Sequence, residues 1–313
     1  MKLGYSKPLY ILPFDHRHSY GAEVFGFHEP MSPEQTAVVA ESKQVIYEGY
    51  KLAVSQGAPV DKSGILVDEE FGAAVLRDAR QQGYIVAMPT EKSGQHEFDF
   101  EYGDQFGAHV DEFDPTFTKV LVRYNPASDK ELNARQLERL KRLSDYLHER
   151  GRLYMFEMLV PAEPDQLEAC GGQKQYDDQV RPGLMVQAIR EIQDAGVEPD
   201  VWKIEGLDRR EDCVNIVEAA RRGGREHVGC IVLGRGESEQ KVVEWLQTAA
   251  DVPGFIGFAV GRSTFLQTIV DFRAGKLDKE ASARQIAERF LNWIEIFETA
   301  RDKQLIAGGS RGA

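Results

Sequence analysis

The stretch Pro199-Asp200-Val201-Trp202-Lys203-Ile204-Glu205-Gly206 is typical of a short buried strand that ends in two charged residues and a glycine. Because side chains alternate along a strand, Lys203 is predicted on one face and Trp202 and Ile204 on the other. An unpaired ammonium among apolar side chains is costly, so Lys203 needs an explanation. One explanation is structural: a lysine–glutamate pair, or an amine that reaches the surface. The other is chemical: a lysine kept neutral enough to attack a carbonyl and form a Schiff base.

On both sides of this stretch, strand patterns alternate with helical ones. The other predicted strands span residues 9–14, 64–67, 84–88, 117–122, 153–156, 228–233 and 255–258. The predicted helices cover about 33–56, 71–82, 102–109, 129–149, 182–195, 209–222 and 238–249, with another that opens near 263 and a long one over 278–302. The segment 161–178, which is rich in proline, glycine and acidic residues, is expected to be a loop.

Regular alternation of strand and helix predicts parallel strands joined by right-handed crossovers. Eight such units in 313 residues fit a (β/α)₈ TIM barrel, whose usual length is about 250 residues before insertions. A doubly wound open sheet is the competing α/β fold, but the first strand is not followed by a glycine-rich dinucleotide fingerprint. We therefore expect a single barrel domain over residues 1–313, with an extra C-terminal helix and a loose tail from about 305 to 313.

Composition limits the possible partners. The 51 acidic and 38 basic residues give a formal charge of -13, which argues against nucleic acid or an anionic membrane as a partner. The three cysteines lack metal-type spacing, as expected for reduced thiols in the cytoplasm. The N-terminus has no signal-peptide pattern, and no apolar run approaches the ~20 residues needed to span a bilayer. We expect a cytoplasmic protein and, because the last helix has apolar positions to pack on the barrel or another subunit, a homo-oligomer.

Barrel enzymes build their sites at the C-terminal ends of the strands. In this chain those ends carry Asp15, Glu69, Glu91 with Lys92, Lys119 with Arg123, Glu157, Lys203, Arg235 and Arg262. Two of the ends, Gly234-Arg235-Gly236 and Gly261-Arg262-Ser263, follow strands seven and eight, where barrels commonly bind phosphate. An arginine adds a bidentate fork for phosphate oxygens. Charged residues so placed predict a site for a small phosphorylated substrate.

These residues form one coherent chemical set. Lys203 would attack a ketone and lose water to give an iminium that allows a carbon–carbon bond to break. Glu157, on the neighbouring strand, is the candidate proton carrier. Lys119 would favour the neutral amine of Lys203 and orient Glu157, and Asp15 would accept hydrogen bonds from substrate hydroxyls. The alternative for Asp15, Glu157 and Lys119 is a structural ion network that closes the barrel.

Six segments of the chain, taken in order, resemble the tagatose-1,6-bisphosphate aldolase family of class I aldolases. They are Leu66-Val67-Asp68-Glu69-Glu70-Phe71-Gly72, Glu91-Lys92-Ser93-Gly94, Lys119-Val120-Leu121-Val122-Arg123-Tyr124, Glu157, Asp200-Val201-Trp202-Lys203-Ile204-Glu205 and Val260-Gly261-Arg262-Ser263-Thr264-Phe265. The sulfofructose-phosphate aldolases look similar. The opening Tyr10-Ile11-Leu12-Pro13-Phe14-Asp15-His16-Arg17 looks closer still to the aldolase-like domain fused to the sugar kinase of inositol catabolism, 5-dehydro-2-deoxygluconokinase.

The resemblance implies that Lys203 forms the Schiff base with a dihydroxyacetone-phosphate unit, that Glu157 handles protons, and that Arg262 and nearby amides hold the phosphate. Further substrate contacts are expected from Gly234, Arg235, Gly236, Gly261, Lys92, Arg123, Glu69, His16 and Arg17. The chain departs from the tagatose enzymes where His16 replaces a glutamine and where Arg235 replaces a small residue. An added arginine would suit a carboxylate, as in 2-deoxy-5-keto-gluconate 6-phosphate.

Two other functions remain open from the sequence. His16, His18 and His96 suggest a metal-dependent aldolase, although a His-x-His pair after a strand is weak evidence for a metal site. A sugar-phosphate-binding barrel without catalysis would bind phosphate and form no imine. We expect the Schiff-base enzyme, which requires neither a metal nor a cofactor.

Overall fold

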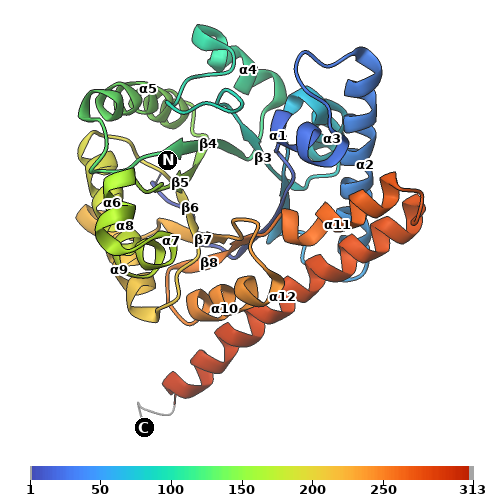
Figure 1. Ribbon diagram of the computed structural model, residues 1–313. Coiled ribbons are helices and arrows are strands. Elements are labelled where there is room, and N and C mark those ends of the chain that lie inside the picture. Colours follow the sequence, from blue (N-terminus) through green and yellow to red (C-terminus); the bar gives the residue numbers. More distant parts are fainter. Residues whose placement is uncertain (1, 310–313) are drawn as a thin grey trace.

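The computed structural model describes residues 2–309, and within them eight parallel strands follow one another around a closed barrel (Figure 1). The strands are β1 (Leu9–Pro13), β2 (Ser63–Leu66), β3 (Ile85–Pro89), β4 (Phe117–Arg123), β5 (Leu153–Leu159), β6 (Val201–Glu205), β7 (Gly229–Leu233) and β8 (Phe255–Ala259). Strand β8 pairs with β1 and closes the barrel. The predicted (β/α)₈ fold is confirmed.

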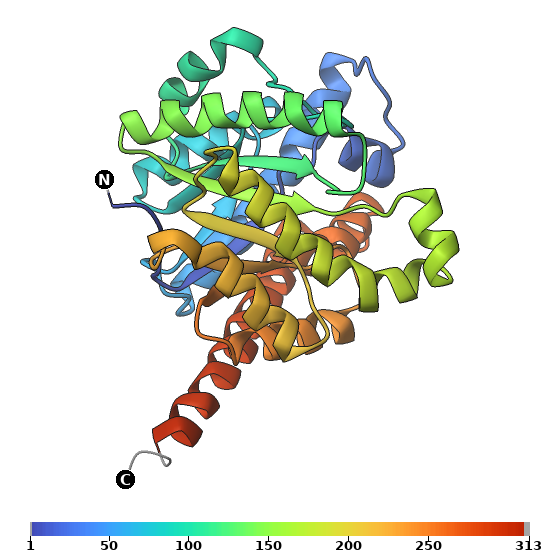
Figure 2. The same cartoon turned by 90° about the vertical axis from the view of Figure 1, so that its left-hand side faces the viewer.

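Helices surround the barrel on its outside (Figures 1 and 2). The main ones are α2 (Pro33–Ser55), α3 (Glu69–Gln81), α4 (Phe106–Phe113), α5 (Lys130–Glu149), α8 (Arg181–Asp194), α9 (Arg210–Arg221), α10 (Glu239–Ala250), α11 (Arg262–Arg273) and α12 (Lys279–Gly309). Short turns of helix are α1 (His18–Tyr20), η1 (Gly21–Phe25), η2 (Gly103–Gln105), α6 (Pro164–Cys170), α7 (Gln173–Gln175), η3 (Tyr176–Val180) and η4 (Arg222–Gly224). None of the helices described is long and apolar enough to cross a membrane.

Two segments differ from the sequence-based expectation. The expected loop 161–178 contains α6, α7 and the start of η3. Its helix signals are local: Pro164 occupies the first turn, Glu163 and Gln166 form a capping box, and Gly171 ends α6 at a φ of 90°. At the other end of the chain α12 continues to Gly309, so residues 305–309 are helical rather than loose. Residues 310–313 of the expected tail lie outside the described residues.

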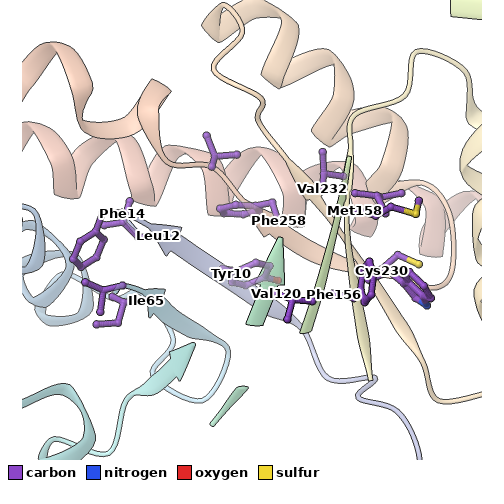
Figure 3. Packing of buried hydrophobic residues seen from close by; sticks show 14 of the residues in the cluster. Tyr10, Leu12, Phe14, Ile65, Val120, Phe156, Met158, Cys230, Val232 and Phe258 are labelled. Atoms are coloured by element: carbon purple, nitrogen blue, oxygen red, sulfur yellow. The ribbon is translucent and has the colours of Figure 1, made fainter. Parts of the chain in front are cut away.

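The strands carry one apolar layer on each face. The outer layer packs against the helices, and Figure 3 shows part of it, including Tyr10, Phe156, Val232 and Phe258. The inner layer fills the barrel with Leu9, Ile11, Leu66, Ala87, Phe117, Met155, Val201, Ile231, Ile256 and Ala259. In β6 Trp202 and Ile204 belong to the outer layer and Val201 to the inner one, so the predicted alternation is confirmed.

The extra C-terminal helix predicted from the sequence is present. Helix α12 runs along the outside of the barrel and packs against α2, α10 and α11 (Figure 1). Gly49 on α2 allows a close approach, because a Cβ there would lie 2.6 Å from Cγ2 of Ile286. Since α2 follows β1 and α12 follows the last βα unit, this contact ties the two ends of the barrel together.

Candidate active site

A cavity of about 340 Å³ opens at the C-terminal ends of the strands. Of the predicted site residues it is lined by Asp15, His16, Arg17, Lys92, Lys119, Arg123, Glu157, Lys203, Gly234, Arg235, Gly236, Gly261 and Arg262. Segments far apart in the sequence thus meet where the parallel strands end, as the barrel fold requires. Glu91, which the sequence analysis noted but did not assign to the site, also lines the cavity.

Lys203 and Glu157 lie side by side in this cavity. They are neighbours in the register of β5 and β6, and Nζ of Lys203 is 2.7 Å from Oε1 of Glu157. The other oxygen of Glu157, Oε2, is 2.9 Å from Nζ of Lys119. Only 4% of the Lys203 side chain and 1% of the Lys119 side chain is exposed. The glutamate therefore bridges two buried ammonium groups.

Lys119 is surrounded by carboxylates. Its Nζ is 2.9 Å from Oδ2 of Asp15 and 2.7 Å from Oε1 of Glu91, in addition to Glu157. Burial alone would lower the pKa of Lys119, but the three carboxylates raise it above its ordinary value. Asp15 and Glu91 accept hydrogen bonds from the ammonium, and Glu157 adds a third anionic neighbour. Lys119 is thus a fixed cation that holds other groups in place.

The two lysines in turn keep two carboxyl groups ionised. Burial alone would raise the pKa of Asp15, but Lys119 and then Lys203 hold it far below its usual range. The pKa of Glu157 is likewise lowered: burial opposes ionisation, and the same two lysines outweigh it. The predicted ion network is therefore present, and it lies within a cavity that can admit a substrate.

Glu91 is held differently from these two carboxylates. Its Oε1 contacts Lys119, whereas its buried Oε2 has no hydrogen-bond partner. Burial raises the pKa of Glu91, and the nearby Lys119 and Arg17 only partly oppose this effect. The sequence offered a signal for this residue, because Glu91 lies two positions beyond Pro89, the last residue of β3.

His16 lines the cavity as a neutral imidazole. Burial lowers its pKa to about 4, and its Nδ1 has no hydrogen-bond partner. Its carbonyl accepts a hydrogen bond of 2.9 Å from Nζ of Lys43, which also pairs with Asp68. Sequence reasoning missed Lys43 and Asp68, both of which have fully buried side chains. The available signal was that Lys43 lies within the buried stripe of α2.

Arg262 and Arg235 form the wall after β7 and β8. Nη2 of Arg262, at the start of α11, donates to the carbonyl of Arg235 at 2.8 Å. Gly236 has a φ of 80°, which favours glycine, and a Cβ there would lie 2.6 Å from the Arg262 guanidinium and displace it. The Arg235 guanidinium is 3.2 Å from Glu205 and 3.1 Å from Asp177. It is therefore already neutralised by two carboxylates.

The cations of the cavity differ in whether they have an acidic partner. Among residues 2–303, whose side chains the structure describes, no carboxylate oxygen lies within 4.0 Å of the charged nitrogens of Lys92, Arg123 or Arg262. The Arg123 guanidinium donates to the carbonyl of Gln95 at 2.8 Å. Arg123 ends β4 and Arg262 follows β8, so the two arginines lie on opposite sides of the eight-stranded barrel. Each side of the cavity thus offers positive charge to an anionic group.

Glu69 does not belong to the site, contrary to the sequence-based expectation. It is the first residue of α3 and lies beyond the end of β2 at Leu66. Its Oε1 accepts a hydrogen bond from the Tyr102 hydroxyl at 3.1 Å and lies 3.5 Å from the His109 ring. Burial raises the pKa of Glu69 to about 7 and lowers that of His109 to about 4. This is a second buried polar cluster, beside the cavity.

The three histidines noted in the sequence do not come together. His18 is 3.5 Å from Glu29 and 3.3 Å from Glu70, and these three are the one group of described residues that could share a metal ion. His16 lies in the cavity, and His96 is exposed. The three histidines that suggested a metal-dependent aldolase therefore do not form one cluster.

Comparison with known proteins places the chain in a family. The sequence profile of the family described as "uncharacterized protein conserved in bacteria (DUF2090)" matches residues 4–301. The chain belongs to this family. No curated protein sequence matches the chain.

Solved structures resemble the chain in fold. Fructose-bisphosphate aldolase from Plasmodium falciparum superposes with a TM-score of 0.61 at 14% identity, over 96% of this chain and 91% of the other. A Schiff-base-forming fructose-1,6-bisphosphate aldolase gives 0.56 at 13% identity, over 90% and 94%. Protein Cgl0159 from Corynebacterium glutamicum gives 0.55 at 16% identity, over 96% and 88%. At these identities the likeness shows the aldolase-like barrel fold and not a shared substrate.

Proposed function

We propose that the protein is a class I aldolase that cleaves a phosphorylated keto sugar or sugar acid through a Schiff base on Lys203. The observation that carries the proposal is the buried Lys203–Glu157–Lys119 group inside a polar cavity. A lysine that served only to close the barrel would not need to line a cavity with cations free to bind anions. The resemblance in fold to Schiff-base-forming aldolases adds support.

The geometry suggests how the imine forms. The Lys203 ammonium would pass a proton to Oε1 of Glu157, 2.7 Å away, and the free amine would attack the substrate ketone. Glu157 would then return the proton to the carbinolamine hydroxyl, which leaves as water. Lys119 holds the other oxygen of Glu157 throughout, so the carboxyl stays directed at Lys203. Asp15, which pairs with Lys119, would accept a hydrogen bond from a substrate hydroxyl.

The distribution of free cations bears on the substrate. Strand β6, which carries Lys203, lies midway between β4 and β8 around the barrel. A substrate whose ketone reaches Lys203 could therefore place its phosphate at Arg262 and a second anionic group at Arg123 and Lys92. Among the sugars considered, 2-deoxy-5-keto-gluconate 6-phosphate would present a carboxylate there, whereas tagatose 1,6-bisphosphate and sulfofructose phosphate would present a phosphate or a sulfonate. Arg235 is already paired, so it does not favour the carboxylate.

A cleavage assay tests the proposal. Each of the three sugars would be incubated with the protein, and release of dihydroxyacetone phosphate would be followed. We expect turnover of at least one sugar, unchanged by a chelator and abolished by borohydride added with substrate. Loss of activity with chelator and none with borohydride would instead support the metal-dependent aldolase. Tight binding of all three sugars without turnover would support a binding barrel.

A cytoplasmic location, a homo-oligomer and a single domain stay predictions. The oligomeric state can be measured by sedimentation of the purified chain.

A further inference from the structure

A class I aldolase must move a proton to and from carbon, and the group that does so is a separate question. After cleavage, the enamine on the lysine must be protonated on the carbon next to the imine before the product can leave. Glu157 already has a task, because it carries a proton from the Lys203 nitrogen to the carbinolamine hydroxyl. The inference below rests on the proposed function, because it names a residue for this later step.

The described cavity wall offers few candidates. It includes neither a tyrosine nor a cysteine side chain. The side chains on it that titrate between acidic and neutral pH are Asp15, His16, Glu91 and Glu157. Lys119 is unsuited as the donor, because three neighbouring carboxylates hold it as an ammonium and so disfavour the release of a proton.

Three of these four candidates are poorly suited. Both oxygens of Glu157 are occupied, one by each lysine. Asp15 is held as an anion by Lys119 and Lys203, so it would rarely carry a proton to deliver. His16, with a pKa of about 4, is neutral near pH 7 and has no acidic proton to give.

Glu91 has what the other three lack. One oxygen is fixed by Lys119 at 2.7 Å, which sets the direction of the carboxyl group. The other oxygen, Oε2, is buried and unpartnered, in a residue that lines the cavity. A buried acceptor without a partner is costly, and either a proton or a contact with substrate would relieve that cost. Three successive ion pairs link Glu91 to Lys203. Glu91 contacts Lys119, Lys119 contacts Glu157, and Glu157 contacts Lys203.

We propose that Glu91 is a catalytic residue that exchanges a proton, through Oε2, with the carbon next to the Lys203 imine. In the cleavage direction the carboxylic acid gives its proton to the enamine carbon. The electrons of the carbon–carbon double bond form the new C–H bond, and the nitrogen lone pair restores the iminium. In the reverse direction the carboxylate takes that proton, the C–H pair becomes the double bond, and the C=N pair returns to nitrogen. No other reactant is needed.

Two measurements on dihydroxyacetone phosphate alone test this role, so the natural aldehyde need not be known. The first is exchange of the C3 hydrogen for deuterium in heavy water, followed by NMR, which reports proton transfer at carbon. The second is borohydride trapping on Lys203, which reports imine formation. The variants are Glu91→Gln, which keeps an oxygen for Lys119 but cannot take up a proton, and Glu91→Asp. Glu112→Gln, an exposed residue of α4, is the matched control.

In Glu91→Gln we expect deuterium exchange to fall about 10²–10⁴-fold, the usual contribution of a general acid or base, while the trapped adduct persists. Glu91→Asp should recover part of the exchange, and the control should match the wild type. Wild-type exchange in Glu91→Gln would overturn the inference. Loss of adduct and exchange together would also overturn it, since Glu91 would then act by positioning Lys119. Absence of an adduct in the wild type would instead refute the proposed function itself.

Discussion

The inside of the barrel has two layers of opposite character, separated by a single step of alternation along the strands. The lower layer is apolar. The upper layer, two residues nearer the C-terminal ends of the strands, is charged. The pairs on successive strands are Phe117 and Lys119 on β4, Met155 and Glu157 on β5, and Val201 and Lys203 on β6. All six side chains are almost completely buried. Burial is thus the same in both layers, and only the chemistry differs.

The difference indicates what each layer contributes. A buried apolar side chain stabilises the fold by about 1.5–3 kcal/mol. Buried charges must be desolvated, and replacing a buried ion pair by apolar residues is often neutral or stabilising. The charged layer is therefore poorly explained by stability. It is well explained by a reaction that needs an amine, a proton carrier and a fixed cation within reach of a substrate.

The largest effect on turnover is expected from replacing Lys203, the proposed nucleophile of the upper layer, by an apolar residue. Lys203→Met removes the nucleophile, and turnover should fall on the order of 10³-fold or more, because no other group can form the imine. The midpoint of urea unfolding should fall modestly, because Glu157 loses one of its two buried ammonium partners and keeps Lys119. Steady-state kinetics and urea titration measure the two effects. A large loss of stability with residual turnover would mean that Lys203 is structural.

Removing the central cation should damage the upper layer in a different way. Lys119→Met leaves Asp15, Glu91 and Glu157 buried around an apolar side chain, at a cost of about 3–5 kcal/mol. The pKa of Asp15 is lowered in the fold, so its stabilisation is present above its unfolded value of ~3.9 and lost as the pH falls below it. The variant should therefore show less stability loss between pH 4 and pH 2 than the wild type. Equal acid sensitivity of both proteins would contradict this account.

A substitution in the lower layer should change the stability of the protein and leave the formation of the Lys203 adduct unchanged. Met155→Ala, one step below Glu157, should lower the free energy of unfolding by about 2–5 kcal/mol because it leaves a cavity in the inner core. At a temperature where the variant stays folded, the yield of the Lys203 adduct should match that of the wild type. A loss of adduct without loss of stability would contradict the claim that the lower layer contributes to stability and only the upper layer to the reaction.

Glu69, a buried acid that does not line the cavity, should affect stability without affecting turnover. The pKa of Glu69 is raised to about 7, so the fold favours its protonated form, and this advantage is lost as the pH rises from ~4.3 through 7. Glu69→Gln should therefore stabilise the protein by about 1–3 kcal/mol at pH 8 and little at pH 4. Turnover should be unaffected. Thermal melts at the two pH values measure this, and no pH-dependent gain would argue against the raised pKa.

Much of the barrel and its site is readable in the sequence because both follow from short-range rules. Alternation within β6 places Lys203 inward, and the parallel connections bring every strand end to one rim. Glu69 shows where such rules stop, since helix α3 begins at that residue and the residue does not line the cavity. Segment 161–178 has the overall composition of a loop, but the local capping signals at Glu163 and Pro164 determine its helix α6.

Other features depend on contacts between distant segments, which no local pattern contains. The pairing of Lys43 with Asp68 beneath the His16 carbonyl joins α2, the start of α3 and the end of β1. The pairing of Arg235 with Glu205 and Asp177 likewise depends on how the loops fold over one another. An arginine in the sequence predicts a positive charge, but only the structure shows whether that charge is already neutralised.

The most direct test of the central claim is to locate a covalent adduct. The protein would be incubated with dihydroxyacetone phosphate, reduced with sodium borohydride and digested, and the modified peptide identified by mass spectrometry. We predict one reduced adduct on Lys203, absent from Lys203→Ala and still formed in the surface variant Glu112→Gln. An adduct on another lysine, or no adduct in a protein that still cleaves its substrate, would contradict the assignment of Lys203 as the Schiff-base residue.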